Sequence, residues 1–162
     1  MKYYETGMKA EKEFCALMED YGGAYLNTSM VQQNKDIDCT IRKDKRTVSV
    51  KEQHSADKFN MFLFEYKQIR TRDLETIDGN FISCEADLYA IATPSSWYIF
   101  DASKLKEYVN SNNWSTVYTT AYTESLNRKY KGMQGYDRTM SYKVPIKSLV
   151  NNGCFLYKCK RK

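Results

Sequence analysis

The sequence contains a single histidine, His54, and no CxxC pair among its five cysteines. Structural zinc sites are built from histidines and closely spaced cysteines, so we expect no zinc site. The cysteines are Cys15, Cys39, Cys84, Cys154 and Cys159. Their odd number and scattered spacing predict reduced thiols in a cytoplasmic protein, most of them small core residues rather than disulfide partners.

Long hydrophobic runs are also missing. No apolar stretch approaches the roughly 20 residues that a membrane span needs. Residues 1–14 are charged and lack the apolar centre of a secretory signal peptide, so we expect neither a signal peptide nor a membrane partner. With 162 residues and 42% hydrophobic content, the chain can bury a sizeable core. We therefore expect one domain over residues 1–162.

Acidic residues are scarce in the last third of the chain. Residues 103–162 carry 12 Lys and Arg against 3 Asp and Glu, a net charge of +9, whereas residues 1–102 carry 13 against 17, a net charge of −4. An acidic part beside a basic part suits a metal-dependent enzyme that acts on a polyanion. The alternative interpretation is an ordinary solvated surface.

The first half of the chain predicts a helix followed by three strands. Residues 8–21 have apolar positions at helical spacing, and Gly22 follows as a stop. Alternation then predicts strands over 24–31, 36–41 and 47–51, the last two joined by the polar turn 42–46. The segment 56–71 fits neither a helical nor a strand period clearly.

The second half predicts two buried strands and a helix before a polar segment. The expected elements are strands over 86–92 and 97–100, a helix over 103–109 with Ser103 as its N-cap, and closing strands over 141–146 and 154–158. Residues 110–142 are rich in Tyr, Asn, Ser, Thr, Lys and Arg. This segment is either a long functional loop or a small β excursion.

The chemistry centres on the hairpin predicted over 36–51. Strand alternation places Asp38 on the same sheet face as Ser49 and Lys51 of the neighbouring strand. A carboxylate beside a lysine suits a divalent metal next to a phosphate. The other interpretation is a surface hairpin with a cross-strand ion pair. Asp36 is either a second ligand or a solvent-exposed strand cap.

Three segments resemble the PD-(D/E)XK nuclease superfamily, in particular archaeal-type Holliday junction resolvases and related small phage proteins. Residues 7–14, GMKAEKEF, resemble the opening of the first resolvase helix, and Asp38 with residues 39–41 resembles the strand that carries the motif aspartate. Residues 48–51, VSVK, occupy the place of the hydrophobic-E-x-K strand. Downstream, ADLYAIA and SWYIFD resemble further core strands, so the likeness covers about residues 5 to 102.

The resemblance implies a set of site residues, with one departure. Ser49 stands where the second acid of the superfamily belongs, and serine is a poor metal ligand. The phage relatives carry an S-x-K-x-Q segment followed by a downstream glutamate, which here are Ser49 to Gln53 and Glu65. The resemblance therefore assigns metal binding to Asp38, Glu65 and Glu11, and contact with the scissile phosphate to Lys51 and Gln53.

The implied fold is α/β: a restriction-endonuclease-like core over 5–109, with a central mixed β-sheet flanked by helices, and a basic C-terminal elaboration over 110–162. The implied activity is a Mg²⁺-dependent DNA endonuclease, with Mn²⁺ as a substitute, acting on Holliday junctions or other branched DNA. The resemblance further implies a homodimer and, for a phage protein, action in the host cytoplasm. The alternative is a catalytically inactive module that binds nucleic acid or protein on the same fold.

The polar segment after residue 110 has the composition of a nucleic-acid contact. Tyrosines alternate there with Arg128, Lys129, Lys131 and Arg138. Aromatic rings stack on unpaired bases and cations meet phosphates, so these four cations are expected to contact branched or single-stranded DNA. For any one tyrosine, packing within a strand is the alternative role. Neutralising Arg128, Lys129 and Lys131 together is expected to weaken DNA binding and to reduce its salt dependence.

Overall fold

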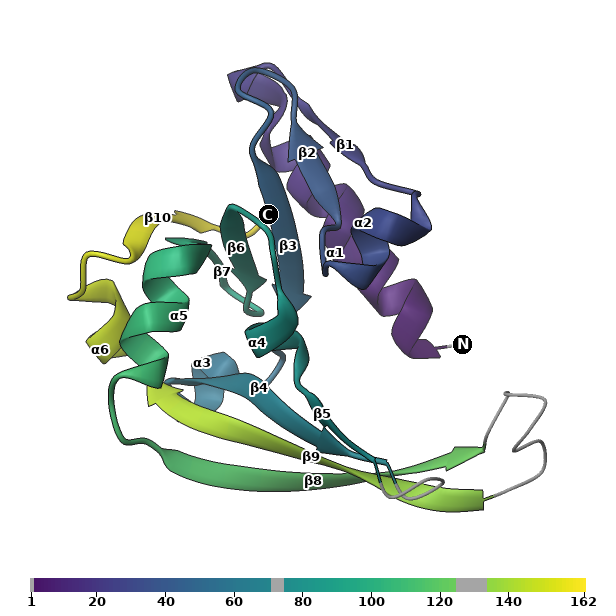
Figure 1. Cartoon of the computed structure of the whole chain (residues 1–162). Coiled ribbons are helices and arrows are strands. Elements are labelled where there is room, and N and C mark those ends of the chain that lie inside the picture. Colours follow the sequence, from purple (N-terminus) through teal and green to yellow (C-terminus); the bar gives the residue numbers. More distant parts are fainter. Residues whose placement is uncertain (1, 71–74, 125–133) are drawn as a thin grey trace.

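The chain folds into two β-sheets with helices packed against them (Figure 1). The computed structural model describes residues 2–70, 75–124 and 134–162, with the backbone alone at 2–7, 121–124 and 134–137. The helices are α1 (Lys2–Leu17), the 3-10 helix η1 (Glu19–Tyr21), α2 (Met30–Asn34), α3 (Ala56–Phe59), α4 (Asn80–Ser83), α5 (Ala102–Asn110) and α6 (Ile146–Val150).

The larger sheet has six strands in the order β1-β2-β3-β6-β7-β10. They are β1 (Ala24–Leu26), β2 (Cys39–Ile41), β3 (Thr47–Glu52), β6 (Leu88–Ala92), β7 (Ser96–Asp101) and β10 (Phe155–Lys160). Neighbours are antiparallel except for β3 and β6, which are parallel, so the sheet is mixed. The α/β class and the mixed sheet predicted from the sequence are confirmed at this level.

The smaller sheet has four antiparallel strands in the order β5-β4-β9-β8. They are β5 (Thr76–Asp78), β4 (Met61–Ile69), β9 (Gln134–Pro145) and β8 (Ser115–Glu124). The ambiguous segment 56–71 is thus a short helix followed by a long strand. The polar segment 110–142 forms most of a β-hairpin, β8–β9, so the β alternative was correct and its extent was underestimated. Figure 1 shows these two long strands curving along one end of the molecule.

Helix α1 covers one face of the larger sheet. Ala10 and Phe14 of the helix pack on Val48, Val50 and Ala90. Small residues at this face let the helix approach the strands closely, and Phe14 fills the remaining space against the ring of Trp97, 5.8 Å away between centroids. This packing fixes the position of Glu11, one residue after Ala10.

The opposite face of the larger sheet is covered by the smaller sheet together with α5, rather than by helices alone as predicted. The interface is aromatic: Phe62 of β4 lies 5.2 Å from Tyr98 and 6.2 Å from Phe100, measured between ring centroids. Leu105 and Val109 of α5 belong to the same core. The predicted flanking helix is present on this face as α5, but the smaller sheet was not predicted: the alternating Phe62 and Phe64 form a strand that presents both rings to the larger sheet.

Several predicted boundaries also need correction. The strand predicted over 24–31 ends at Leu26, and residues 30–34 form helix α2. The strand predicted from Asp36 begins only at Cys39, because Asp36 has a positive φ of 58°. Asp101, rather than Ser103, caps α5: its carboxylate accepts the Lys104 N–H at 3.0 Å. The strand predicted over 141–146 is the end of β9.

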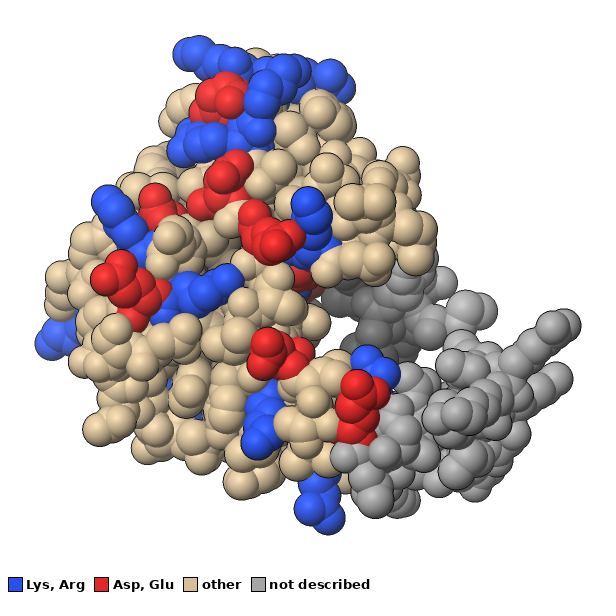
Figure 2. Space-filling model, viewed as in Figure 1, with Lys and Arg blue, Asp and Glu red and all other residues tan. Residues whose placement is uncertain are grey.

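Charged side chains of both signs share the surface seen in Figure 2. Basic residues gather over the turn between β2 and β3, and acidic residues are spread across the middle of the same face. The turn contains the run Arg42 to Arg46. Across the described ranges, no helix is long and apolar enough to cross a membrane.

Candidate active site

Lys51 lies at the centre of the candidate site, near the end of β3. Val48 and Val50 face α1, so Ser49 and Lys51 point to the other side of the strand, as strand alternation predicts. The Lys51 Nζ donates to Asp36 Oδ1 at 2.7 Å, and the two side chains are 24% and 16% exposed. Burial lowers the pKa of Lys51, but the charges of Asp36 and Asp38 outweigh it and raise that pKa above its ordinary value. Lys51 is therefore a fixed positive charge.

Asp36 occupies the place that the sequence analysis assigned to Asp38. Its left-handed backbone follows α2, where its N–H donates to the Gln33 carbonyl at 3.0 Å. The turn directs the carboxylate over β3, and the Ser49 hydroxyl donates to Asp36 Oδ2 at 3.0 Å. A carboxylate thus lies directly above Ser49, the position where the resemblance expects an acid.

Asp38 makes a backbone contact that the sequence did not predict. Its carboxylate accepts the Val50 N–H at 2.7 Å, and its own N–H donates to the Val48 carbonyl at 2.9 Å. The Asp38 carboxylate thus takes the place of a backbone carbonyl as the partner of the Val50 N–H, at the point where β2 no longer pairs with β3. Burial raises the pKa of Asp38 more than the Val50 hydrogen bond and the Lys51 charge lower it. Asp38 is held at the strand edge and does not hydrogen-bond with Ser49 or Lys51 as Asp36 does.

Glu11 reaches Asp38 from helix α1. Burial, followed by the charge of Asp38 and a hydrogen bond with it, raises the pKa of Glu11 to about 7. When protonated, the Glu11 carboxyl donates to the Asp38 carboxylate. At neutral pH this pair therefore carries a readily exchanged proton.

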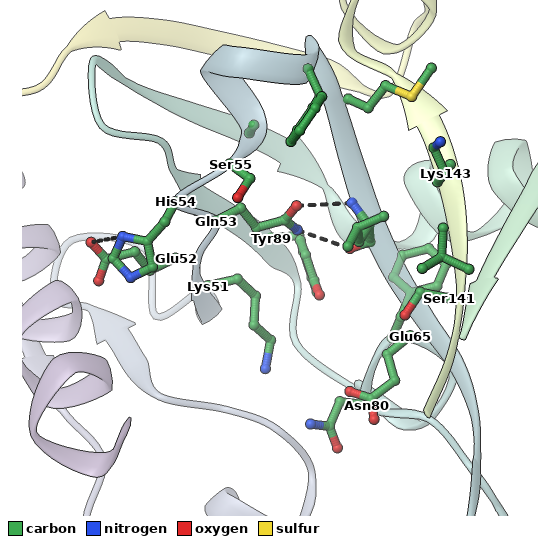
Figure 3. A pocket seen from close by; sticks show the side chains of 16 residues that line it. Lys51, Glu52, Gln53, His54, Ser55, Glu65, Asn80, Tyr89, Ser141 and Lys143 are labelled. Atoms are coloured by element: carbon green, nitrogen blue, oxygen red, sulfur yellow. Dashed lines mark hydrogen bonds and ion pairs between the residues drawn. The ribbon is translucent and has the colours of Figure 1, made fainter. Parts of the chain in front are cut away.

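Glu65 approaches from the smaller sheet. In Figure 3 the side chains of Lys51, Glu65 and Asn80 point into the same space. Burial raises the pKa of Glu65, and the charge of Asp36 adds to the rise while that of Lys51 opposes it. Glu65 is thus close enough to the Asp36–Lys51 pair to feel both charges.

The backbone around Glu65 is shaped by a β-bulge and a glycine. The pairing of β4 with β9 shifts register between Glu65 and Lys67. Bulges of this kind redirect the neighbouring side chains. Gly79 packs on the bulge so closely that a Cβ there would lie 2.3 Å from the Glu65 carbonyl oxygen. Only glycine permits this approach, so Gly79 supports the backbone that carries Glu65.

The side chain of Gln53 forms hydrogen bonds within the fold. Its amide nitrogen donates to the Leu63 carbonyl and its amide oxygen accepts the Leu63 N–H, both at 2.9 Å. These bonds are drawn in Figure 3. They provide hydrogen-bond partners for the Leu63 backbone on the edge of β4 that β5 pairs with only further along, from Lys67 to Ile69. The phosphate contact predicted for Gln53 would require breaking this pair of bonds.

Other predicted residues lie apart from this centre. Arg138 is exposed on β9, whereas Arg128, Lys129 and Lys131 lie outside the described residues. His54 is 69% exposed, with its Nδ1 3.9 Å from Glu52.

Two contacts beyond the site escaped the sequence analysis. Asp87, for which the sequence suggests no role, accepts both the N–H and the hydroxyl of Thr47 and so joins the starts of β3 and β6. Arg161 pairs with Glu13 at 2.8 Å and Glu52 at 3.0 Å, a role that its place in a basic tail concealed.

The acids form pairs rather than a finished metal site. Within residues 2–70, 75–124 and 134–162, no three histidine, cysteine, aspartate or glutamate side chains converge as metal ligands. Asp36 is engaged by Lys51 and Ser49, and Asp38 by Val50 and Glu11. The donors are nevertheless carboxylate oxygens, the ligands that Mg²⁺ prefers. Burial, with a smaller contribution from neighbouring acids, raises the pKa of Glu11, Asp38 and Glu65, and a bound divalent cation would favour their charged forms. The residue types therefore fit a metal, although Lys51 already pairs with Asp36.

A groove of about 840 Å³ opens beside these residues. Its lining runs from Lys51 and Glu65 along β4 to Phe59 of α3, with Lys143 of β9 on the way. Comparison of the chain with protein-family models, curated proteins and solved structures finds no match. The geometry and the residues of the site therefore carry the functional argument.

Proposed function

We propose that this protein is a divalent-metal-dependent DNA endonuclease with a restriction-endonuclease-like core, acting on branched DNA such as a four-way junction. One observation carries the proposal: four carboxylates from three segments of the chain lie close enough to one largely buried lysine, at the end of β3, for their charges to interact with it. The carboxylates are Glu11, Asp36, Asp38 and Glu65, and the lysine is Lys51. Structural ion pairs need one acid for each base, and this surplus of acids suits binding of a metal.

The arrangement of elements also supports the proposal. A helix that carries Glu11 is followed by three antiparallel strands, β1 to β3, and then by β6 parallel to β3. This order agrees with the core that the motif resemblance implies. The site lies where β3 leaves the sheet, at an edge open to the groove.

Each residue has a role in the proposed reaction. Asp36, Asp38 and Glu65, with Glu11 beside Asp38, would hold Mg²⁺ or Mn²⁺. A bound metal would supply an activated water and neutralise charge on the phosphodiester. Lys51 would exchange Asp36 for a phosphate oxygen, so that its fixed charge stabilises the negative charge that grows in the transition state.

Cleavage assays test the proposal directly. Nicking of supercoiled plasmid and cleavage of a four-way junction are measured with Mg²⁺ or Mn²⁺ for the wild type, Lys51→Ala and Asp36→Asn. We expect each variant to lose at least about 100-fold in rate, because each removes a charge at the reacting phosphate. The matched controls are Lys104→Ala and Asp20→Asn, which change exposed residues elsewhere. Cleavage that survives in both site variants contradicts the assignment.

Metal binding has its own measurement. At pH 8 in the absence of DNA, millimolar Mg²⁺ or Mn²⁺ is expected to raise the melting temperature of the wild type, because binding to the folded state alone stabilises it. Asp36→Asn is expected to reduce this rise and Asp20→Asn to preserve it. An equal rise in all three proteins would place the metal elsewhere.

A homodimer is part of the proposal, because a four-way junction presents two symmetry-related strands for cutting. Sedimentation of the protein alone and on a junction tests this part. A protein that remains a monomer in both conditions would contradict it.

One observation favours a second candidate, a non-catalytic nucleic-acid-binding module on the same fold. Ser49 replaces the second acid, and the Asp36–Lys51 ion pair closes the centre of the site. If the wild type cleaves neither plasmid nor junction with either metal but binds junction DNA, this function replaces the first.

A further inference from the structure

The groove beside Lys51 has a floor with a regular chemical pattern. Met61, Leu63 and Glu65 alternate with the buried Phe62 and Phe64 along β4, so the first three side chains share the face of the strand that lines the groove. A track of side chains therefore leads from the short helix α3 to Glu65 at the candidate active site.

The neighbouring strand continues this pattern. Register pairing places Lys143 opposite Leu63 and Ser141 opposite Glu65. Both side chains line the groove, and Figure 3 shows Lys143 on the strand beside β4. The groove thus has a cation next to an apolar residue at its middle and Lys51 at its inner end.

The outer end of the groove is unusually apolar for an exposed surface. Phe59 is 62% exposed and Leu63 is 41% exposed. The Lys58 Nζ lies 5.3 Å from the centre of the Phe59 ring. An exposed ring with a lysine beside it offers a stacking surface and a phosphate contact together, the two features of single-strand recognition.

We propose that this groove binds an unpaired nucleotide of the DNA substrate, with its base stacked on Phe59 and packed against Leu63. The adjoining phosphates would lie along Lys143 and Lys51. The inference rests on the proposed function, and it adds the substrate class: a base that is unpaired next to the scissile phosphate. A base within a duplex is stacked on both faces and cannot offer one to Phe59, so continuous duplex would bind without this contact.

Binding of a fluorescent oligonucleotide tests the inference without cleavage. A single strand containing 2-aminopurine is titrated with protein in EDTA, and its anisotropy and base fluorescence are recorded. We expect Phe59→Ala to weaken binding about tenfold and to abolish the stacking-induced change in fluorescence. Phe59→Tyr, which keeps a stacking ring, is expected to remain within about twofold of the wild type.

Two controls separate stacking from general effects. Tyr21→Ala removes another exposed ring, 58% exposed and outside the groove, and is expected to leave binding unchanged. A duplex of the same sequence is expected to bind wild type and Phe59→Ala equally. Circular dichroism and melting temperature confirm that each variant is folded.

The outcomes distinguish this inference from the proposed function. Equal single-strand binding by wild type and Phe59→Ala overturns the inference, even if cleavage depends on Lys51 as proposed. If Phe59→Ala loses single-strand binding but the wild type cleaves no DNA with either metal, the nucleotide-binding groove is supported and the proposed nuclease activity is overturned.

Discussion

The two faces of the six-stranded sheet are built differently. The α1 face is packed with aliphatic and small residues such as Val50 and Ala90, whereas the opposite face is filled by rings such as Phe62, Tyr98 and Phe100. The acids divide in a similar way, since Glu11 comes from the helix and Glu65 from the smaller sheet. The site is therefore assembled where two independently packed layers meet at the end of β3, and each layer can be perturbed separately.

The largest effect is expected from the aromatic layer. Phe62→Ala removes a fully buried ring that contacts three other rings, and the cavity is expected to cost about 3–5 kcal/mol of unfolding free energy. Phe59→Ala, at an exposed ring of the same type, is expected to stay within about 0.5 kcal/mol. Urea denaturation measures both. Similar losses in the two variants would mean that the smaller sheet does not depend on this interface.

The next largest effect is expected for Arg161, which forms ion pairs with Glu13 of helix α1 and Glu52 of β3. Arg161→Ala leaves Glu13 and the largely buried Glu52 without their cation, and we expect a loss of about 2–4 kcal/mol. Arg46→Ala breaks the exposed pair with Asp44, which solvent screens, and is expected to lower the melting temperature much less. Thermal melts at low and high salt compare the two. If Arg161→Ala melts like Arg46→Ala, the C-terminal strand does not stabilise the helix layer.

A smaller effect is expected on the support of Glu65. Gly79→Ala forces a Cβ against the backbone of Glu65, and the required shift is expected to cost about 1–3 kcal/mol. The shift should also lower cleavage more than it lowers DNA binding, because Glu65 moves. Gly153→Ala is the matched control, since a Cβ there meets nothing within 4 Å. Unchanged stability and cleavage in Gly79→Ala would contradict the supporting role.

The smallest effect on stability is expected for Glu11 of helix α1, and it depends on pH. The pKa of Glu11 is raised from 4.5 to about 7 because burial and Asp38 disfavour its charged form. Its contribution to stability is therefore complete below pH 4.5 and is lost as the pH rises through 7. Glu11→Gln, which cannot ionise, is expected to melt with a weaker pH dependence between pH 5 and 8.

Melting curves at several pH values, with Glu19→Gln at an exposed position of the same helical region as the control, check this prediction. A wild type that becomes more stable from pH 5 to 8, by an amount that Glu11→Gln abolishes, would reverse the sign and contradict it.

The regular elements were the most predictable part of the fold. The strands β3, β6 and β7 were predicted within two residues at each end, because buried alternating or continuous apolar runs leave few other structures. The smaller sheet was not predicted as a unit. Its central pairing joins β4 to β9 across a long interval of sequence, and polar, tyrosine-rich strands such as β8 carry weak local signals.

The site was predictable in composition and not in geometry. Glu11, Lys51 and Glu65 are the residues that the motif resemblance predicts, and the structure places Glu11 and Glu65 each close enough to Lys51 for their charges to interact with it. Asp36 was set aside in favour of Asp38 because strand alternation assumes an extended backbone. Asp36 instead has a positive φ in the turn after α2, so its backbone is not extended. As a result Asp36, and not Asp38, hydrogen-bonds with Ser49 and Lys51. The periodicity of apolar residues does not predict the dihedral angle of a single residue.

The Arg161 contact also has a consequence for the order of folding. It joins residues 148 positions apart in the chain, whereas the Thr47–Asp87 contact spans 40 positions. Contacts of long sequence separation form late, because closing a longer loop costs more entropy. During synthesis the parallel pair β3–β6 can form long before Arg161 emerges, so the Arg161–Glu13 ion pair is added to a helix α1 that already packs on these strands through Ala10 and Phe14.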